Sequence, residues 1–163
     1  MRMKLFFLAL ALAFVIGCMS SYVYINVQAS SSQETPYSSG KAEPSPFDRV
    51  PESSIHVYPD KVVIDMENVK WASYADTHSM EPVLKAGANG LELIPKSAAD
   101  IYLGDIVAYH ADWSDGLIVH RVIDSGYDAS GRYFTLKGDN NSSADPGKVR
   151  FSQIEYVLIG VIY

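Results

Sequence analysis

From residue 55 onward, short apolar runs alternate with turn-forming residues along the chain. The runs rich in β-branched and aromatic residues are 55–58, 61–65, 91–94, 105–110, 117–123, 132–137 and 154–163. Gly, Pro, Asp or Asn bounds most of these runs, which is typical of short strands joined by turns. No long segment carries apolar residues at helical spacing, and only 97–101 favours a short helix. The pattern therefore predicts a mainly β, antiparallel domain over 55–163.

The N-terminal pattern is different, because an uncharged and largely apolar run covers 5–27. A helix of that length would extend about 34 Å, enough to cross the hydrocarbon core of a bilayer. Arg2 and Lys4 precede the run, and no further Lys or Arg occurs before Lys41. Because positive residues favour the cytoplasmic side, we expect 1–27 to form a single-pass transmembrane helix in the cell membrane. Its N-terminus would be cytoplasmic and the rest of the chain extracytoplasmic.

Two other interpretations of this N-terminus stay open. The first half of the run is short enough for a cleaved signal peptide. Residues 15–18, Val-Ile-Gly-Cys, also resemble a bacterial lipoprotein cleavage site, with Cys18 as the lipidated residue. All three interpretations place the remaining chain on the same side of the membrane. Cys18 is the only cysteine, so no intramolecular disulfide can form.

Residues 28–54 differ from both flanking segments in composition. They are rich in Ser, Pro, Gly and Glu and contain few large apolar side chains. Such a stretch buries too little apolar surface to order itself, which predicts a flexible linker. The predicted organisation is therefore an anchor (1–27), a linker (28–54) and a β-rich domain (55–163).

The charge of the chain excludes one class of partner. The formal net charge is -6, and the basic residues form no cluster after the N-terminus. Nucleic-acid-binding proteins carry basic patches that neutralise phosphates. We therefore expect no nucleic-acid partner.

Two residues in separate segments are candidates for nucleophilic catalysis. Ser79 lies between a run that favours extended structure and a turn fixed by Pro82. A serine hydroxyl is a weak nucleophile unless a nearby base accepts its proton. His120 lies in an expected strand, where alternation places it on the same face as Ile118 and Val122. His78 is a poorer candidate base, because adjacent residues of an extended chain point to opposite faces.

A base of this kind works best when a carboxylate orients it and stabilises its charged form. Asp139 and Asp145 both lie in the turn-rich segment 138–147, which follows the expected strand 132–137. Asp and Asn also occur there simply as turn residues. The spacing of the two carboxylates does not decide which of them orients His120.

Together and in this order, these segments resemble signal peptidase I. Residues 79–82 (Ser-Met-Glu-Pro) are similar to its serine motif, and 104–110 to the strand that follows. Residues 118–123 are similar to the motif that carries the base, and 136–141 with Asp145 to its acidic motif. The bacterial branch has lysine at the position of His120. Histidine there is typical of the archaeal and endoplasmic-reticulum type.

The resemblance implies a role for each candidate residue. Ser79 is implied as the nucleophile, His120 as the general base, Asp145 as the residue that orients it, and Asp139 as a supporting acidic residue. Thr77 occupies the position whose hydroxyl helps the Ser79 backbone N–H to bind the oxyanion. The chain departs from the family pattern in having His78 where glycine usually precedes the serine, and a long segment between the apolar run and Ser79.

The implied function is that of a membrane-anchored serine endopeptidase that removes signal peptides from secreted preproteins through an acyl-enzyme. No metal or organic cofactor is implied, since zinc needs a tight cluster of His, Cys or carboxylate ligands. One alternative is a self-cleaving repressor of the serine–lysine type, which the histidine and the missing DNA-binding segment do not favour. The other is a catalytically silent, membrane-tethered binding module on the same fold.

Overall fold

The computed structural model describes residues 43–163. The expected membrane anchor (1–27) and most of the expected linker lie outside the described residues. In the part that is described, no helix is long and apolar enough to cross a bilayer.

The described chain is mainly β, as the pattern of apolar runs predicted. Its strands are β1 (Ile55–Val57), β2 (Val62–Ile64), β3 (Val69–Ser73), β4 (Asn89–Leu93), β5 (Ile106–His110), β6 (Leu117–Asp128), β7 (Gly131–Lys137) and β8 (Ile154–Ile162). Three short 3-10 helices are η1 (Glu52–Ser54), η2 (Ala98–Asp100) and η3 (Phe151–Gln153). The predicted helix near 97–101 is η2, which Ser97 and Asp100 cap reciprocally.

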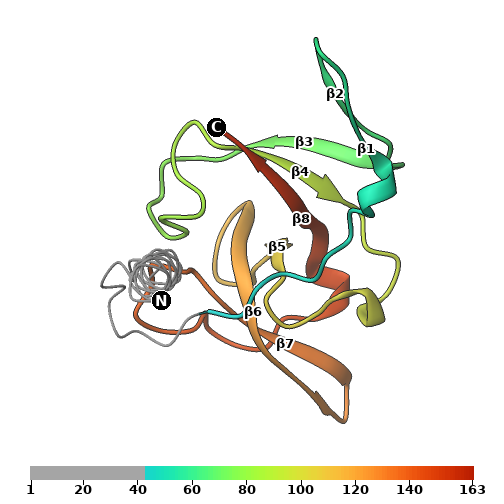
Figure 1. Ribbon diagram of the computed structural model, residues 1–163. Helices are drawn as coiled ribbons and strands as arrows, with labels where there is room; N and C mark the ends of the chain where they lie inside the picture. Colours follow the sequence, from blue (N-terminus) through green and yellow to red (C-terminus); the bar gives the residue numbers. More distant parts are fainter. Residues whose placement is uncertain (1–42) are drawn as a thin grey trace, which may run out of the picture. The chain divides into compact units, whose positions relative to one another are not determined.

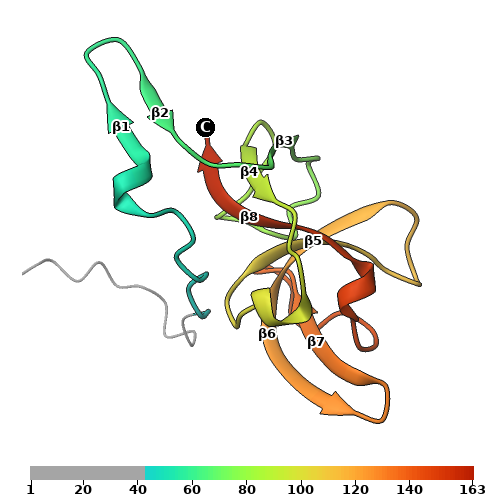
Figure 2. The ribbon, with the colours of Figure 1, turned by 90° about the vertical axis from the view of Figure 1, so that its right-hand side faces the viewer.

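Six strands form one antiparallel sheet in the order β3-β4-β8-β5-β6-β7. The remaining two, β1 and β2, form a separate hairpin that projects from this sheet (Figures 1 and 2). The apolar runs did not predict β3. It is an edge strand with Lys70 and Trp71 exposed, so it lacks the alternation that marked the other strands.

The central strands are buried on both faces. On β5, Val107 and Tyr109 belong to one core cluster, and Ile106 belongs to a second cluster that includes Met80 and Leu84. Alternate residues of a strand point to opposite faces, so β5 has packed side chains on either side. This gives the residues of β5 and its neighbours fixed backbone positions from which to build a site.

Residues 43–54 pack against the domain, which corrects the expected extent of the flexible linker. They belong to the same compact unit as the strands. The Arg49 guanidinium forms two hydrogen bonds of 2.7 and 2.6 Å with the buried Asp105 carboxylate. Phe47 stacks on Tyr102 with their ring centroids 4.2 Å apart. Composition predicted a spacer because it counts apolar side chains, whereas an ion pair and one aromatic contact order this segment.

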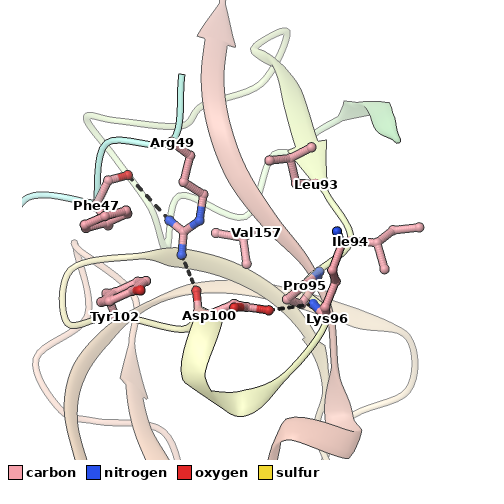
Figure 3. A pocket seen from close by; sticks show the side chains of 9 residues that line it. All are labelled: Phe47, Arg49, Leu93, Ile94, Pro95, Lys96, Asp100, Tyr102 and Val157. Atoms are coloured by element: carbon pink, nitrogen blue, oxygen red, sulfur yellow. Dashed lines mark hydrogen bonds between the residues drawn. The ribbon is translucent and has the colours of Figure 1, made fainter. Parts of the chain in front are cut away.

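Figure 3 shows the surface pocket that this docked segment helps to form. Its volume is about 310 Å³. Arg49 lies beside the rings of Phe47 and Tyr102 and donates hydrogen bonds to the backbone carbonyls of Phe47 and Asp100. The positive charge of Arg49 is thus already compensated inside the domain.

Candidate active site

Ser79 lies in a turn after β3, where the neighbouring loop holds its backbone from the opposite side. The backbone N–H of Asn140 donates to the Ser79 carbonyl at 2.9 Å, and the Asn140 side chain donates to the His78 carbonyl at 3.0 Å. This contact is so close that a Cβ at Gly138 would lie 2.6 Å from the Ser79 carbonyl oxygen. Glycine is therefore required at 138 for the two loops to meet.

The ring of His78 contacts carboxylates and forms no hydrogen bond with the Ser79 hydroxyl in the described chain. The φ of His78 is +60°, a left-handed conformation that favours glycine. Its ring is exposed and binds Glu81, with 2.9 Å between Nδ1 and Oε1, while Asp76 lies 3.6 Å from Nε2. The bond to Glu81, followed by the charge of Asp76, raises the pKa of His78. The ring is thus engaged by two carboxylates.

His120 is held in β6 by the register of the sheet. Its Cα partner on β5 is Val107, so these two residues point to the same face of the sheet. The His120 and Asp145 side chains are each 6% exposed, and 2.6 Å separates Nδ1 from Oδ2. A carboxylate only accepts hydrogen bonds, so the imidazole Nδ1 carries the proton and donates it. The structure therefore pairs His120 with Asp145, the choice that the sequence left open.

This pairing leaves the second ring nitrogen of His120 for other chemistry. Within residues 43–163, Nε2 has no hydrogen-bond partner, and no buried side-chain nitrogen or oxygen lacks one. The His120 side chain also lines a surface cleft. A neutral imidazole with its proton on Nδ1 presents an acceptor at Nε2, which is the form that a general base needs.

Ser79 and His120 line the same cleft, which has a volume of about 430 Å³. Thr77 lines it too, with its hydroxyl oxygen 3.2 Å from Ser79 Oγ. The other lining residues are Tyr74, Ala75, Met80, Leu84, Trp113, Ser114, Asp115, Leu117, Ile118 and Val119. No hydrogen bond joins Ser79 to His120 within the described chain, and such bonds commonly tighten only when substrate binds.

The comparisons with known proteins found no relative of this chain. No protein-family model matches the chain, and neither the curated proteins nor the solved structures contain a significant match. The functional argument therefore rests on the geometry of this cleft.

Asp139, the second predicted carboxylate, has a different partner from His120. Its two oxygens accept hydrogen bonds of 2.7 and 2.6 Å from Nε and a terminal nitrogen of Arg121. The other terminal nitrogen of Arg121 donates to the carbonyls of Gly104 and Pro44. The resemblance implies a supporting role for Asp139, here in holding its loop. Its carboxylate does so through an arginine and not through backbone N–H groups.

Three residues with structural roles at the cleft were not identified from the sequence. Arg121 and Asn140 adjoin the candidate residues His120 and Asp139, so proximity in sequence was the available signal. The third is Tyr109, whose hydroxyl donates to Asp145 Oδ2 at 2.8 Å. Tyr109 lies in an apolar run that predicts a strand, and nothing in the local sequence distinguishes it.

One group of side chains near the cleft has the composition of a metal site. Asp76, His78 and Glu81 place three ligand-type atoms within 4.8 Å of one another, and no other such group occurs in residues 43–163. All three are wholly or partly exposed to solvent. Their mutual pairing already accounts for the arrangement, so it gives no reason to assign a metal to them.

Proposed function

We propose that this chain is a serine endopeptidase of the signal-peptidase type, acting on secreted preproteins. The observation that carries the proposal is the buried pair of His120 and Asp145, joined at 2.6 Å, in the cleft that also contains Ser79. A histidine with one nitrogen fixed by a carboxylate, in a cleft that also contains a serine, is the arrangement that can activate a hydroxyl nucleophile.

The reaction starts with attack of Ser79 Oγ on the scissile carbonyl carbon, while His120 Nε2 takes the hydroxyl proton. The resulting imidazolium is stabilised by Asp145, which already accepts the proton-bearing Nδ1. The Ser79 backbone N–H and the Thr77 hydroxyl are the donors closest in sequence for the oxyanion. His120 then gives its proton to the departing amine, which leaves an acyl-enzyme. Water, deprotonated by His120, releases the new carboxyl end and regenerates Ser79.

The lining of the cleft is compatible with a polypeptide substrate. Its walls combine aromatic and aliphatic side chains such as Tyr74, Leu84 and Trp113 with the polar groups of Thr77 and Ser79. Peptide-binding clefts generally surround a few oriented polar groups with apolar surface. The choice of preproteins among polypeptides rests on the resemblance in the sequence motifs.

The membrane location belongs to the same proposal. An apolar segment over 5–27 with Arg2 and Lys4 before it supports a single-pass anchor that places the catalytic domain outside the cytoplasm. There the domain would meet preproteins as they emerge from the bilayer. External protease should then digest residues 43–163 in intact spheroplasts, and protection of these residues would reverse the topology.

The deciding experiment is cleavage of a preprotein by the full chain in detergent or lipid vesicles. The wild type should release mature protein with a single new N-terminus, and Ser79→Ala should abolish release. Ser125→Ala, on an exposed part of β6 outside the cleft, is the matched control and should cleave normally. A serine-directed fluorophosphonate should label the wild type and the control but not Ser79→Ala. Equal cleavage by all three, or none by the wild type, would overturn the proposal; the second result would favour the silent binding module.

A further inference from the structure

Asp145 is bound from two sides at one oxygen atom. Its Oδ2 accepts the His120 Nδ1 proton at 2.6 Å and the Tyr109 hydroxyl proton at 2.8 Å. Tyr109 is completely buried, and its ring belongs to the main core cluster. The hydrogen bonds therefore lead from His120 at the cleft, through Asp145, to the buried phenol of Tyr109.

The backbone accounts for this convergence. In the β5–β6 register, Val107 is opposite His120 and Tyr109 is opposite Ile118, so Tyr109 and His120 lie on one face of neighbouring strands. The pairing of β5 with β8 shifts between Ala108 and Tyr109. Such bulges re-aim side chains and occur beside active sites. Asp145 reaches the same face because its backbone N–H donates to the Leu136 carbonyl at 2.8 Å.

We propose that Tyr109 is a positioning residue of this site, whose hydroxyl orients Asp145 toward His120 and shares the negative charge of the carboxylate. The catalytic meaning of this role rests on the proposed peptidase function. The structural claim, that the Tyr109 hydroxyl tunes His120 through Asp145, stands on the two hydrogen bonds alone.

The hydroxyl of Tyr109, and not its ring, is the group that suggests a role at the site. A phenylalanine ring could fill the same space in the core, so packing does not require the oxygen. A buried hydroxyl needs a partner, and the partner here is the one carboxylate that also binds the base. Burial, with a further contribution from Asp145, raises the pKa of Tyr109, so the hydroxyl stays protonated and continues to donate as the pH changes.

The test compares pH profiles of preprotein cleavage by the full chain and by Tyr109→Phe. Without the hydroxyl, Asp145 is no longer fixed in its orientation toward His120, and this loss of positioning should lower kcat about tenfold or more, with little change in KM. Without the hydroxyl, more negative charge on Asp145 is left to stabilise the imidazolium. The midpoint of the acidic limb should therefore move upward, by about half a pH unit or more. An unchanged or lowered midpoint would overturn the inference.

Besides Tyr109 itself and Tyr74 at the cleft, charged groups occur on the elements that adjoin His120. They are Asp145 and Asp139 from the loop after β7, Arg121 from the same strand, Lys137 opposite Arg121 on β7, and Asp115 at the cleft. Tyr109→Phe removes none of these charges. A loss of folded protein would lower the amplitude of the profile but would leave its midpoint in place.

Tyr74→Phe is a matched control, because Tyr74 also donates to a buried carboxylate, Glu92, at 2.9 Å. Because Tyr74 lines the cleft, the KM of the variant can differ from that of the wild type. The Tyr74 hydroxyl, however, is bonded to Glu92 and not to Asp145. The acidic limb of kcat should keep its wild-type midpoint. A shift equal to that of Tyr109→Phe would show a general effect of losing a buried phenol, and would overturn the specific role.

An NMR titration of the His120 imidazole separates failure of this inference from failure of the proposed function. It needs no cleavage, and His120→Gln assigns the signal. The titration midpoint in Tyr109→Phe should lie above that of the wild type even if the chain cleaves nothing. Cleavage without any change in this midpoint would leave the peptidase proposal standing and overturn the role of Tyr109.

Discussion

Arg121 and Asp139 form a two-point ion pair whose side chains are only 6% and 7% exposed. Arg121 follows His120 in β6, and Asp139 precedes Asn140, which holds the backbone of Ser79. The same arginine donates to the carbonyl of Pro44. One buried pair therefore connects the strand of His120, the loop that supports Ser79 and the docked segment before β1.

Asp139→Asn and Asp145→Asn should separate stability from catalysis. Asp139→Asn leaves the Arg121 charge buried without its partner, which should lower the free energy of unfolding by about 3–5 kcal/mol. Some cleavage should remain at temperatures where the protein is folded. Asp145→Asn should keep most of its stability but lose about four orders of magnitude in turnover, because an amide favours the wrong tautomer of His120. Paired melting and turnover measurements check this, and the reverse pattern would exchange the two roles.

Substitutions at His78 test whether its ring has a part in the reaction. His78→Gly and His78→Ala both remove the ring, and both should cleave preprotein at rates close to the wild type. They should differ in stability, since φ is +60° and a left-handed conformation costs a non-glycine residue about 1 kcal/mol or more. His78→Gly should therefore melt above His78→Ala. Loss of cleavage in both variants would make His78 part of the catalytic machinery.

Gly138→Ala should displace the backbone of Ser79 while leaving the side chains of the proposed site unchanged. The added Cβ would lie 2.6 Å from the carbonyl oxygen of Ser79, so the two loops must separate. A displacement of this order at a nucleophile should lower kcat/KM about a hundredfold. Gly160→Ala is the control, because its Cβ would meet only the Leu91 side chain at an ordinary 3.6 Å. Near-normal kcat/KM in Gly138→Ala would show that the contact is not needed.

The sequence predicted the strands well where short runs of β-branched residues met clear turns, as at β5 and β7. It predicted β6 only as far as residue 123, whereas the strand continues to Asp128 through polar and exposed residues. It did not predict β3, whose exposed Lys70 and Trp71 break the alternation, or the docking of 43–54, which depends on Arg49 meeting a distant Asp105. The motifs supplied Ser79, His120 and both aspartates. Which aspartate meets His120 depends on how the loop after β7 folds back, and local spacing does not contain that information.

Glu92 gives the fold a predictable dependence of stability on pH. It lies in β4 with 5% exposure, and the Tyr74 hydroxyl donates to its Oε1 at 2.9 Å. Burial raises the pKa of Glu92, and the bond from Tyr74 offsets this only in part. Between the ordinary pKa of glutamate and this raised value, the native state binds more protons than the unfolded state. The contribution of Glu92 to the free energy of unfolding therefore falls as pH rises through that window.

Glu92→Gln removes this titration and keeps an oxygen that can accept the Tyr74 proton. The variant should melt above the wild type at neutral pH, because the buried charge no longer forms. Its advantage should shrink as pH falls toward the ordinary range of glutamate, where the wild-type carboxyl is protonated in both states. Melting temperatures measured across this range check the prediction, and Glu67→Gln, at an exposed position, should show no such trend. If Glu92→Gln melts no higher than the wild type, or higher by the same amount at every pH, then burial does not raise the pKa of Glu92 in the folded protein.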